Sequence, residues 1–445
     1  MTQPLPPGWK SKKFSELNNF VSKSITPNKH SSEIFELYSV PAFPTDTPEY
    51  LQGKDIGSTK QAVSPDDVLV CKINPRINRV WVVGQKTKLK QIASSEWIVF
   101  RSSDILPDFA KYYFTSPLFR EMLCEDVSGV GGSLTRARPQ IVNRLPVAFP
   151  LTLYEQKRIV AKLDRLLAKV DSCRAHLDRA AKAIKRFRQS VLNAAVTGQL
   201  TSELNLTTKN DYEEISDYLS KQDNLRNKDD DKPILFEEFD LPNHWNSAPL
   251  GFLISACSYG SSQKSEKVGL VPVLRMGNIQ SGLLDWEDLV YTSDQTEIGK
   301  YLLEPGDVLF NRTNSPELVG KTALYKEGSL KAIYAGYLIR VKTKPILKPQ
   351  FLTYCLNSSY GRKFSWQVKT DGVSQSNINA SKLCTFPTPV CSKKEQEEIV
   401  KRVEVLFNKA DEMESKLTAA RERVDKLTAS ILAKAFRGEL VSQKN

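Results

Sequence analysis

The feature that most constrains the fold of this chain is a heptad pattern of apolar residues that occurs twice, 240 residues apart. Apolar residues alternate in steps of four and three, which is typical of a long helix that packs on another helix. Every position of the first copy has an apolar match in the second. The seam positions are Ile159, Leu163, Leu166, Val170, Cys173, Leu177, Ala180, Ile184, Phe187 and Val191, and then Ile399, Val403, Leu406, Ala410, Met413, Leu417, Ala420, Val424, Leu427 and Ile431.

Both ends of each predicted helix carry matching cap signals. A hydroxyl residue followed three positions later by glutamate is a capping box, in which each side chain satisfies a backbone amide of the first turn. A glycine at the far end suits a left-handed cap. We therefore predict two helices of about 45 residues, roughly 65–70 Å long at ~1.5 Å per residue. The cap residues are Thr152, Glu155 and Gly198 in the first copy and Ser392, Glu395 and Gly438 in the second.

A helix of this length cannot bury its apolar stripe alone. Equal lengths and matched seams favour packing of the two helices on each other, because each is the nearest partner of the other. The alternative is that each helix is a separate coiled-coil arm that pairs with another subunit. The pattern by itself does not set the relative direction of the helices.

The remaining sequence also repeats, so the 445-residue chain is predicted to contain two similar halves. Each half opens with Leu-Pro-x-x-Trp (residues 5–9 and 241–245) and contains Pro-x-Asp-Val-Leu (residues 65–69 and 305–309). Short strand-like runs split by Gly, Pro and Asn follow, with one helix expected near 109–122 and one near 351–364. The predicted segments are an α/β domain at 1–151, a helical region at 152–200, an acidic connector with one helical piece at 201–240, a second α/β domain at 241–391 and a second helical region at 392–445.

Charge is unevenly distributed along the chain. The net charge is +12, but residues 201–240 contain twelve acidic and five basic residues, so the connector is −7 and the rest is +19. This balance suits a polyanionic partner, and solubility is the alternative explanation. The first long helix has eleven basic and four acidic residues between Glu155 and Arg188. That basic stripe could be a solvated face, a partner surface or a contact with DNA.

Seven cysteines without a CxxC pair are read as reduced thiols. The first residues lack the apolar core of a signal peptide, and no run approaches the ~20 apolar residues of a membrane span. We expect a cytoplasmic protein without a membrane partner.

In order, each half contains the Leu-Pro opening, the Pro-x-Asp-Val-Leu strand, a Glu-Gln pair (155–156 and 395–396), the heptad helix and Gly-x-Leu (198–200 and 438–440). This doubled order resembles the specificity subunit of type I restriction-modification systems, the HsdS family. The resemblance covers essentially the whole chain. It implies an α/β (α+β) fold in which two mixed α/β target-recognition domains are separated by an antiparallel pair of long helices.

The resemblance also implies a function. Each recognition domain would read one half of a bipartite double-stranded DNA target. The helices would hold two modification (methyltransferase) subunits and set the spacer between the half-sites. S-adenosylmethionine, ATP and Mg would be bound by the modification and restriction (translocase/nuclease) subunits, and no cofactor by this chain.

None of the candidate catalytic motifs is complete. Asn74-Pro75-Arg76-Ile77 lacks the second proline and the aromatic residue of an adenine-methyltransferase clamp. Gly320-Lys321-Thr322 resembles the end of a phosphate-binding loop, but Ser315 stands where that loop needs glycine. The three histidines are scattered without metal-ligand spacing. We predict a non-catalytic subunit without a metal site.

Reading of DNA sequence requires Arg, Lys, Asn or Gln side chains at base edges, with further basic groups on phosphates. Three places in each half offer such residues, and the third follows glycines (Gly129, Gly131 and Gly132, or Gly372) that allow a close approach of the backbone. Ordinary polar turns are the alternative reading. The candidates are Gln52 and Lys54; Lys72, Asn74, Arg76 and Arg79; Ser133, Thr135, Arg136 and Arg138; Arg275 and Asn278; Asn311, Arg312 and Asn314; and Gln375, Asn377 and Asn379.

Two rival functions remain open from the sequence. One is a structural coiled-coil scaffold whose basic charge is incidental. The other is a specificity chain that serves a single-chain nuclease-methyltransferase instead of a three-subunit enzyme.

Overall fold

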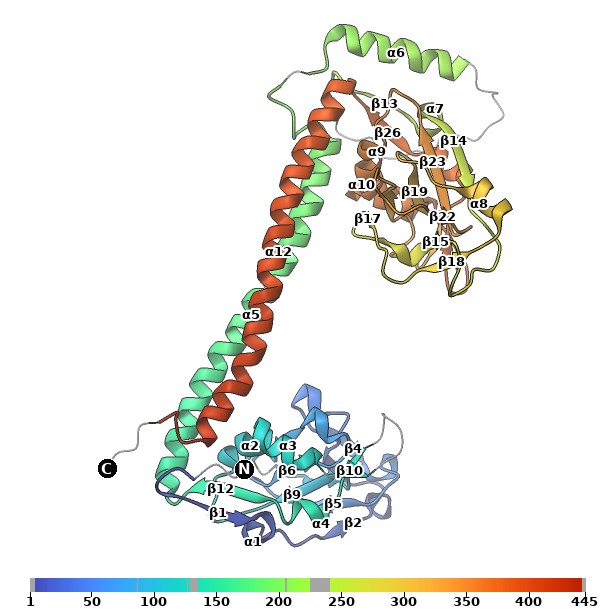
Figure 1. The fold of residues 1–445 in the computed structure, drawn as a ribbon. Coiled ribbons are helices and arrows are strands. Elements are labelled where there is room, and N and C mark those ends of the chain that lie inside the picture. Colours follow the sequence, from blue (N-terminus) through green and yellow to red (C-terminus); the bar gives the residue numbers. More distant parts are fainter. Residues whose placement is uncertain are drawn as a thin grey trace. The chain divides into compact units, whose positions relative to one another are not determined.

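The computed structural model describes residues 5–85, 87–125, 127–128, 135–204, 206–224 and 241–441. The chain divides into two compact units. Unit 1 is Met1–Arg179 with Leu417–Asn445, and unit 2 is Ala180–Lys416. Each unit contains parts of both long helices, α5 (Leu153–Val196) and α12 (Lys393–Phe436), which are labelled in Figure 1. The two helices therefore form as predicted, whereas the five predicted segment boundaries stay a prediction.

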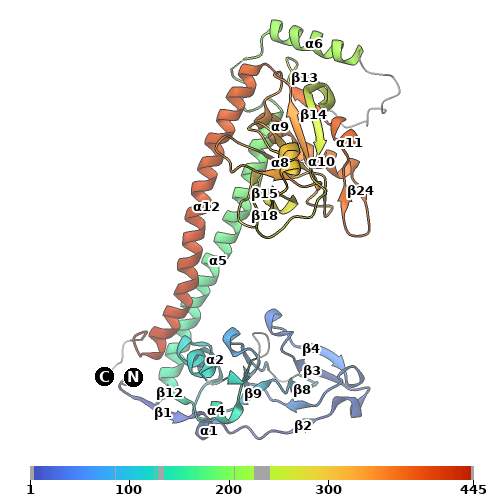
Figure 2. The same ribbon diagram turned by 45° about the vertical axis from the view of Figure 1, so that its right-hand side comes forward.

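The long helices pair antiparallel within each unit. In unit 1, Arg174 on α5 forms an ion pair with Asp425 on α12, with 3.3 Å between Nε and Oδ1. In unit 2, Arg188 on α5 pairs with Glu414 on α12 at 3.2 Å. Figures 1 and 2 show α5 and α12 side by side from two directions. The two helices thus pack on each other within the chain, as predicted, rather than forming two separate arms.

The apolar seam is buried mainly where a globular domain also packs on the helices. Ile159 and Leu163 belong to the buried core of unit 1, and Val191, Ile399 and Val403 belong to that of unit 2. Val170, Ala410 and Val424 are buried outside these cores. The seam residues Leu166, Leu177, Ala180, Ile184, Leu406, Leu417, Ala420 and Ile431 are half-buried.

Four seam residues are exposed rather than covered by the facing helix. Phe187, Met413 and Leu427 are exposed, and so is Cys173. These four residues form two matched pairs, because Cys173 corresponds to Met413 and Phe187 to Leu427 at the 240-residue offset. The physical reason is that a pair of helices covers each apolar stripe from one side only, so residues on its margin stay in contact with solvent.

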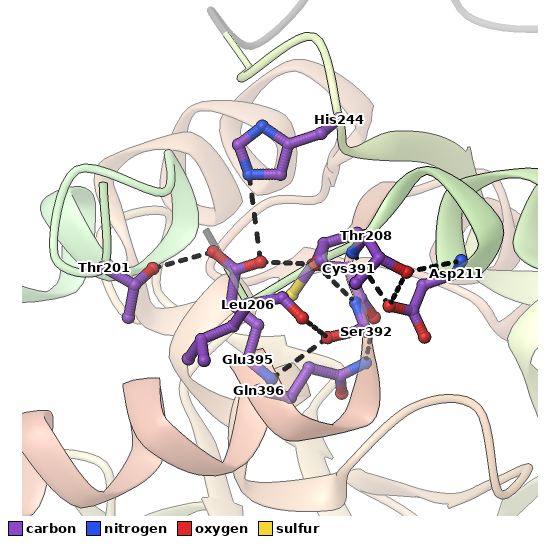
Figure 3. Close-up of polar contacts among 10 residues, drawn as sticks. Thr201, Leu206, Thr208, Asp211, His244, Cys391, Ser392, Glu395 and Gln396 are labelled. Atoms are coloured by element: carbon purple, nitrogen blue, oxygen red, sulfur yellow. Dashed lines mark hydrogen bonds and ion pairs between the residues drawn. The ribbon is translucent and has the colours of Figure 1, made fainter. Parts of the chain in front are cut away.

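The first-turn hydroxyls cap both helices as predicted. The Thr152 hydroxyl accepts a hydrogen bond from the Glu155 amide, and the Ser392 hydroxyl accepts one from the Glu395 amide, both at 3.2 Å. The return bond of the predicted capping box is not made by Glu395. Its carboxylate instead accepts a hydrogen bond from the Thr201 hydroxyl at 2.8 Å (Figure 3).

The glycines at the helix ends pack against the prolines of the Leu-Pro opening of each half. Gly198 and Gly438 have φ of +71° and +76°, the left-handed conformation predicted for them. A Cβ atom on Gly198 would lie 2.5 Å from Cγ of Pro242, and one on Gly438 would lie 2.6 Å from Cβ of Pro6. Each helix end therefore packs against the first residues of the domain in the same unit.

The domain of unit 1 has four sheets among the described residues, one of which is the two-stranded pair of β10 with β11. Strand β1 pairs with β12, the order β2-β5-β8-β3-β4 forms a five-stranded sheet, and β7-β6-β9 forms a three-stranded one. Its strands are β1 (Trp9–Lys13), β2 (Ser24–Ile25), β3 (Ile34–Tyr38), β4 (Glu49–Gln52), β5 (Lys60–Ala62), β6 (Val68–Cys71), β7 (Val80–Val82), β8 (Lys90–Ser94), β9 (Trp97–Phe100), β10 (Val127–Ser128), β11 (Arg136–Ala137) and β12 (Pro146–Pro150). Its helices are α1 (Phe14–Leu17), α2 (Pro107–Thr115), α3 (Pro117–Cys124) and α4 (Pro139–Val142), with 3₁₀ turns η3 (Gly53–Asp55) and η4 (Pro75–Ile77) among others.

The domain of unit 2 repeats the central part of this plan. Strand β13 pairs with β26 as β1 does with β12, and β19 lies between β21 and β23 as β6 lies between β7 and β9. Its strands are β13 (Asn246–Pro249), β14 (Ile254–Tyr259), β15 (Val271–Leu274), β16 (Ile279–Gln280), β17 (Leu283–Leu284), β18 (Val290–Thr292), β19 (Val308–Asn311), β20 (Thr313–Asn314), β21 (Thr322–Leu324), β22 (Ile333–Tyr334), β23 (Leu338–Thr343), β24 (Thr370–Asp371), β25 (Ser376–Asn377) and β26 (Pro387–Val390). Its helices are α6 (Lys209–Asn224), α7 (Leu250–Leu253), α8 (Gln295–Tyr301), α9 (Pro349–Asn357), α10 (Ser359–Val368) and α11 (Ala380–Cys384), with the 3₁₀ turn η5 (Met276–Asn278).

The single helix predicted near the end of each domain is in fact two helices. The first breaks at Ser116, whose hydroxyl caps α3 by accepting from the Phe119 amide. Pro117 follows, and proline suits the first position of a new helix but interrupts a continuing one. In unit 2 the break falls at Ser358, which caps α10 through the Gly361 amide.

Candidate nucleic-acid interface

Each unit brings together its second and third groups of candidate residues. In unit 1 the Ala137 amide donates to the Lys72 carbonyl at 2.8 Å, just beyond β6. In unit 2 the Ile378 amide donates to the Arg312 carbonyl at 2.9 Å, just beyond β19. In both units a backbone bond therefore joins two loops that are far apart in sequence, and its acceptors Lys72 and Arg312 correspond at the 240-residue offset.

In unit 1 these two loops bring several basic residues together. The Asn74 amide donates to the Thr135 carbonyl at 2.7 Å, which extends the contact between the loops. Arg136 pairs with Glu96 at 3.1 Å, and Arg79 donates to the Ile73 carbonyl at 3.3 Å. Two of the predicted arginines are therefore held by the protein.

The turn that carries Arg76 has an unusual backbone. Asn74 and Asn78 have φ of 49° and 50°, a left-handed conformation that asparagine tolerates better than most residues. They flank η4, whose Pro75 is buried while Arg76 and Ile77 are exposed. This geometry presents Arg76 to solvent at the tip of the turn.

The first group in unit 1 lies on a different sheet. Gln52 ends β4 of the five-stranded sheet, and Lys54 lies in the following turn η3. Both are exposed. Arg138, in the third group, is exposed, whereas Ser133, Gly129, Gly131 and Gly132 lie outside the described residues.

In unit 2 a small sheet of β20, β25 and β24 joins the loops. Arg312 donates to Oδ1 of Asn377 at 3.2 Å and to the Gly336 carbonyl at 3.3 Å. Its guanidinium also lies over the Tyr259 ring, with 4.6 Å to the ring centroid. Nδ2 of Asn377 donates to the Thr313 hydroxyl at 2.8 Å. Arg312 is thus fixed at the centre of the site.

The tip of the β24–β25 hairpin is the most exposed part of the site in unit 2. Gln375 lies in this hairpin with an exposed side chain, and the labelled β24 can be followed in Figure 2. Asn314 and Asn379 have local roles: the first accepts from the Ser315 amide, and the second caps α11 by accepting from the Lys382 amide, both at 2.8 Å.

Two predicted contacts do not fit their positions in the structure. Asn278 is 3% exposed, because its side chain bonds to the Arg275 amide and to the carbonyls of Asp285 and Asp288. Asn311 is fully buried at the end of β19. Neither side chain reaches the surface, so both are corrected to structural residues. Arg275 remains half-exposed and pairs with Asp288 at 3.2 Å.

Sequence reasoning missed the aromatic residues at this site. Tyr259 ends β14 beneath Arg312, and its hydroxyl accepts from the Ala380 amide at 2.9 Å. The Tyr337 carbonyl accepts from the Arg312 amide at 3.0 Å, and its ring is exposed. A tyrosine at the end of a strand-like run was the available signal, but only the fold places the Tyr259 ring beside Arg312.

The aspartate of the Pro-x-Asp-Val-Leu motif is buried in each unit, directly before the strand that leads into the candidate loop. Asp67 forms a two-point ion pair with Arg101 at 2.6 and 2.7 Å. Asp307 lies 3.8 Å from Arg340 and 3.9 Å from Lys342. Burial raises the pKa of Asp307 above its ordinary value, although both cations oppose the shift. The motif therefore fixes the strand before the loop.

Among the described residues, no cluster of His, Cys, Asp and Glu has a geometry that could hold a metal ion. In the same part of the chain, no helix combines the length and apolar character needed to cross a membrane.

The fold and the loops together define a class: a duplicated α/β protein on paired antiparallel helices, with loops rich in the side chains that read base edges. Residues 252–422 match the family described as the type I restriction modification DNA specificity domain. The chain is 32% identical over 350 residues to the EcoKI specificity subunit of Escherichia coli. This alignment covers 76% of this chain and 67% of the relative. It is 29% identical over 399 residues to the StySPI specificity subunit of Salmonella potsdam. This alignment covers 88% of this chain and 78% of the relative.

Solved structures show the same fold. A chain from the work on complex assembly and conformational transition of the type I R-M system has a TM-score of 0.73 at 19% identity, covering 98% of this chain and 100% of that one. The HsdS subunit from Thermoanaerobacter tengcongensis has a TM-score of 0.56 at 20% identity, covering 98% of both chains. This chain belongs to the specificity subunits of type I restriction enzymes.

Proposed function

We propose that this specificity subunit reads a bipartite duplex DNA target, with one half-site read by the loops of each unit, and that it performs no catalytic step. The observation that carries the proposal is the matched pair of backbone bonds, Lys72 to Ala137 and Arg312 to Ile378, which builds an equivalent site in each unit. Exposed candidates in these sites are Arg76, Arg138 and Gln375. Their side chains carry the donors used at base edges and phosphates.

The expected partners are two modification subunits and the restriction subunits, with S-adenosylmethionine, ATP and Mg bound by them. Support comes from the exposed seam residues Met413 and Leu427, since apolar residues uncovered along a helix pair favour a protein partner. We also propose a cytoplasmic location, which suits the seven unpaired cysteines.

The test is an exchange of residues 241–390 for the same region of a relative, followed by single-molecule sequencing of methylated adenines in a host carrying the complete complex. One half of the methylated motif should change and the other should stay. The reciprocal exchange of residues 1–150 is the matched control, and it should change the other half. If both halves changed together in either exchange, independent reading would be wrong.

The salt dependence of duplex binding distinguishes a DNA-reading subunit from a coiled-coil scaffold. Release of counterions makes the affinity of a DNA-reading protein fall steeply with salt, and a scaffold has no such slope. Co-purification of the complex distinguishes separate modification and restriction subunits from a single-chain nuclease-methyltransferase.

A further inference from the structure

The lysine of Gly320-Lys321-Thr322 lies directly beside the candidate loop of unit 2. These residues do not form a phosphate-binding loop, yet the Lys321 carbonyl accepts a hydrogen bond from the Asn311 amide at 2.8 Å. Arg312, at the centre of the candidate site, is the residue after Asn311. Lys321 is therefore one backbone bond away from the loop that is proposed to read DNA.

An arginine of helix α10 reaches the segment that carries this lysine. The Arg362 guanidinium donates to the Glu317 carbonyl at 2.7 Å, four residues before Lys321. Gly320 packs closely on α10, because a Cβ atom there would lie 2.9 Å from Cβ of Ser365, about one turn after Arg362. These contacts hold Lys321 and Arg362 on neighbouring parts of one surface.

The two cations have neutral partners instead of acidic ones. The Lys321 ammonium donates to Oε1 of Gln280 at 3.1 Å. Burial lowers the pKa of Lys321, and the positive charge of Arg362 lowers it further. Among the described residues, no carboxylate forms an ion pair with Lys321 or Arg362. Two like charges held together without a counter-ion create a positive potential that favours an anion.

Unit 1 has an arginine at the position that matches Arg362. The Arg120 amide donates to the carbonyl of Ser116, the capping residue of α3, at 3.0 Å. In unit 2 the Arg362 amide donates to the carbonyl of Ser358, the capping residue of α10, at 3.1 Å. The two arginines therefore occupy the same position in α3 and α10.

In unit 1 the second cation comes from the turn η4. Asn78, directly after that turn, donates from Nδ2 to the Thr115 carbonyl at 2.9 Å, where α2 ends and α3 follows. Burial raises the pKa of the Cys124 thiol, and the charges of Arg120 and Arg76 both oppose that shift. Both arginines are exposed, and in the described parts of the chain neither forms an ion pair with a carboxylate. Each unit thus has two such cations, one on α3 or α10 and one on a neighbouring loop.

We propose that each of these cation pairs, Lys321 with Arg362 and Arg76 with Arg120, binds a backbone phosphate of the DNA beside a half-site. The inference rests on the proposed function and adds a contact that is independent of base sequence. Phosphate contacts fix the position of a protein on duplex DNA, whereas base contacts specify the sequence. A guanidinium can bond two phosphate oxygens at once, and an ammonium acts as a point charge. Position favours DNA over an acidic protein surface, because Lys321 adjoins a candidate loop and Arg76 belongs to one.

The test measures duplex binding by the purified complex of the full chain with its modification subunits, over a series of salt concentrations. Lys321→Gln combined with Arg362→Gln should weaken binding of the target duplex and of a scrambled duplex alike, each by about tenfold near ~0.1 M salt. The slope of log affinity against log salt should fall by about 0.9, the contribution of one phosphate. Lys209→Gln is the matched control, because this exposed lysine of unit 2 pairs with Glu213, and it should leave affinity and slope unchanged.

Neutral methylphosphonate linkages, placed one at a time along the target duplex, locate the contact. One position beside the half-site of unit 2 should weaken binding by the wild-type complex but not by the neutral double variant. Lys321→Arg combined with Arg362→Lys keeps both charges and should keep the wild-type slope. Arg76→Gln combined with Arg120→Gln applies the same test to unit 1. Equal midpoints of thermal unfolding separate a loss of binding from a loss of folding.

An unchanged slope in the neutral double variant would overturn the proposal. So would a loss confined to the target duplex, because that pattern indicates base reading. Loss of the modification subunits from this variant in size-exclusion chromatography would assign the cations to a protein partner instead. In these three cases the wild-type complex still discriminates its target, whereas a wild-type complex without such discrimination would contradict the proposed function itself.

Discussion

Arg312 lies over the ring of Tyr259, with 4.6 Å between the guanidinium carbon and the ring centroid. The same guanidinium donates to Asn377 and to the Gly336 carbonyl, so one side chain ties together four segments of unit 2. Its position makes it the organising residue of the proposed site, and it leaves base contacts to the exposed side chains around it.

Arg312→Lys should therefore weaken reading of one half-site without unfolding the protein. Lysine keeps the charge but loses the planar fork that bonds two acceptors and stacks on an aromatic ring. We expect a loss of about 1–3 kcal/mol in specific duplex binding, the range of one good base contact, because the exposed side chains that Arg312 holds in place lose their alignment. Binding titrations at fixed salt measure it, with Arg437→Lys as control. An unchanged affinity would show that Arg312 has no part in binding.

Buried and exposed seam positions should respond differently to charge. Leu163→Asp and its counterpart Val403→Asp each place an acid at a fully buried position. An unpaired buried charge costs several kcal/mol, so both variants should lose the cooperative unfolding transition or much of its midpoint temperature. Met413→Asp, at a position 59% exposed, is the control and should change the transition little. A similar response of all three would contradict the described packing.

Glu395 and Glu155 occupy matched positions in different surroundings, and this gives an internal comparison. Glu395→Ala leaves the buried hydroxyls of Thr201 and Thr207 without their acceptor. We expect a loss of about 1–3 kcal/mol in the free energy of unfolding, with faster amide exchange across residues 201–208. Glu155→Ala should cost less, because that side chain is half-exposed. Equal effects would mean that the contacts of residues 201–208 with Glu395 add no stability.

The spacer of the DNA target should follow the length of the helices. Removing one heptad from each, Arg165–Asp171 and Val405–Asp411, keeps the heptad phase of each helix and shortens each helix by about 10 Å at ~1.5 Å per residue. That length corresponds to about 3 bp of duplex at ~3.4 Å per step.

Mapping of methylated adenines should then give the original half-sites with a spacer roughly 3 bp shorter. Because ~3 bp also rotates one half-site by about a third of the ~10.5 bp repeat, DNA binding by an inactive variant is measured as well. An active variant that keeps the original spacer would show that the helices do not set the distance.

The sequence by itself determined the long helices, their caps and the two-fold repeat. These features are local or periodic: a heptad seam, a hydroxyl cap and a left-handed glycine can be read from spacing alone. Gly198 and Gly438 have the predicted conformation, and Thr152 and Ser392 cap the helices as expected.

Only the tertiary structure decided what those residues pack against. Asn278 and Asn311 resemble surface readers in sequence, but neighbouring carbonyls and the end of a buried strand enclose them. Matching helix starts differ for the same reason: Glu395 is buried and bonded to Thr201 and Thr207, whereas Glu155 is half-exposed. Burial depends on which distant segment folds over a residue, and the local sequence pattern does not identify that segment.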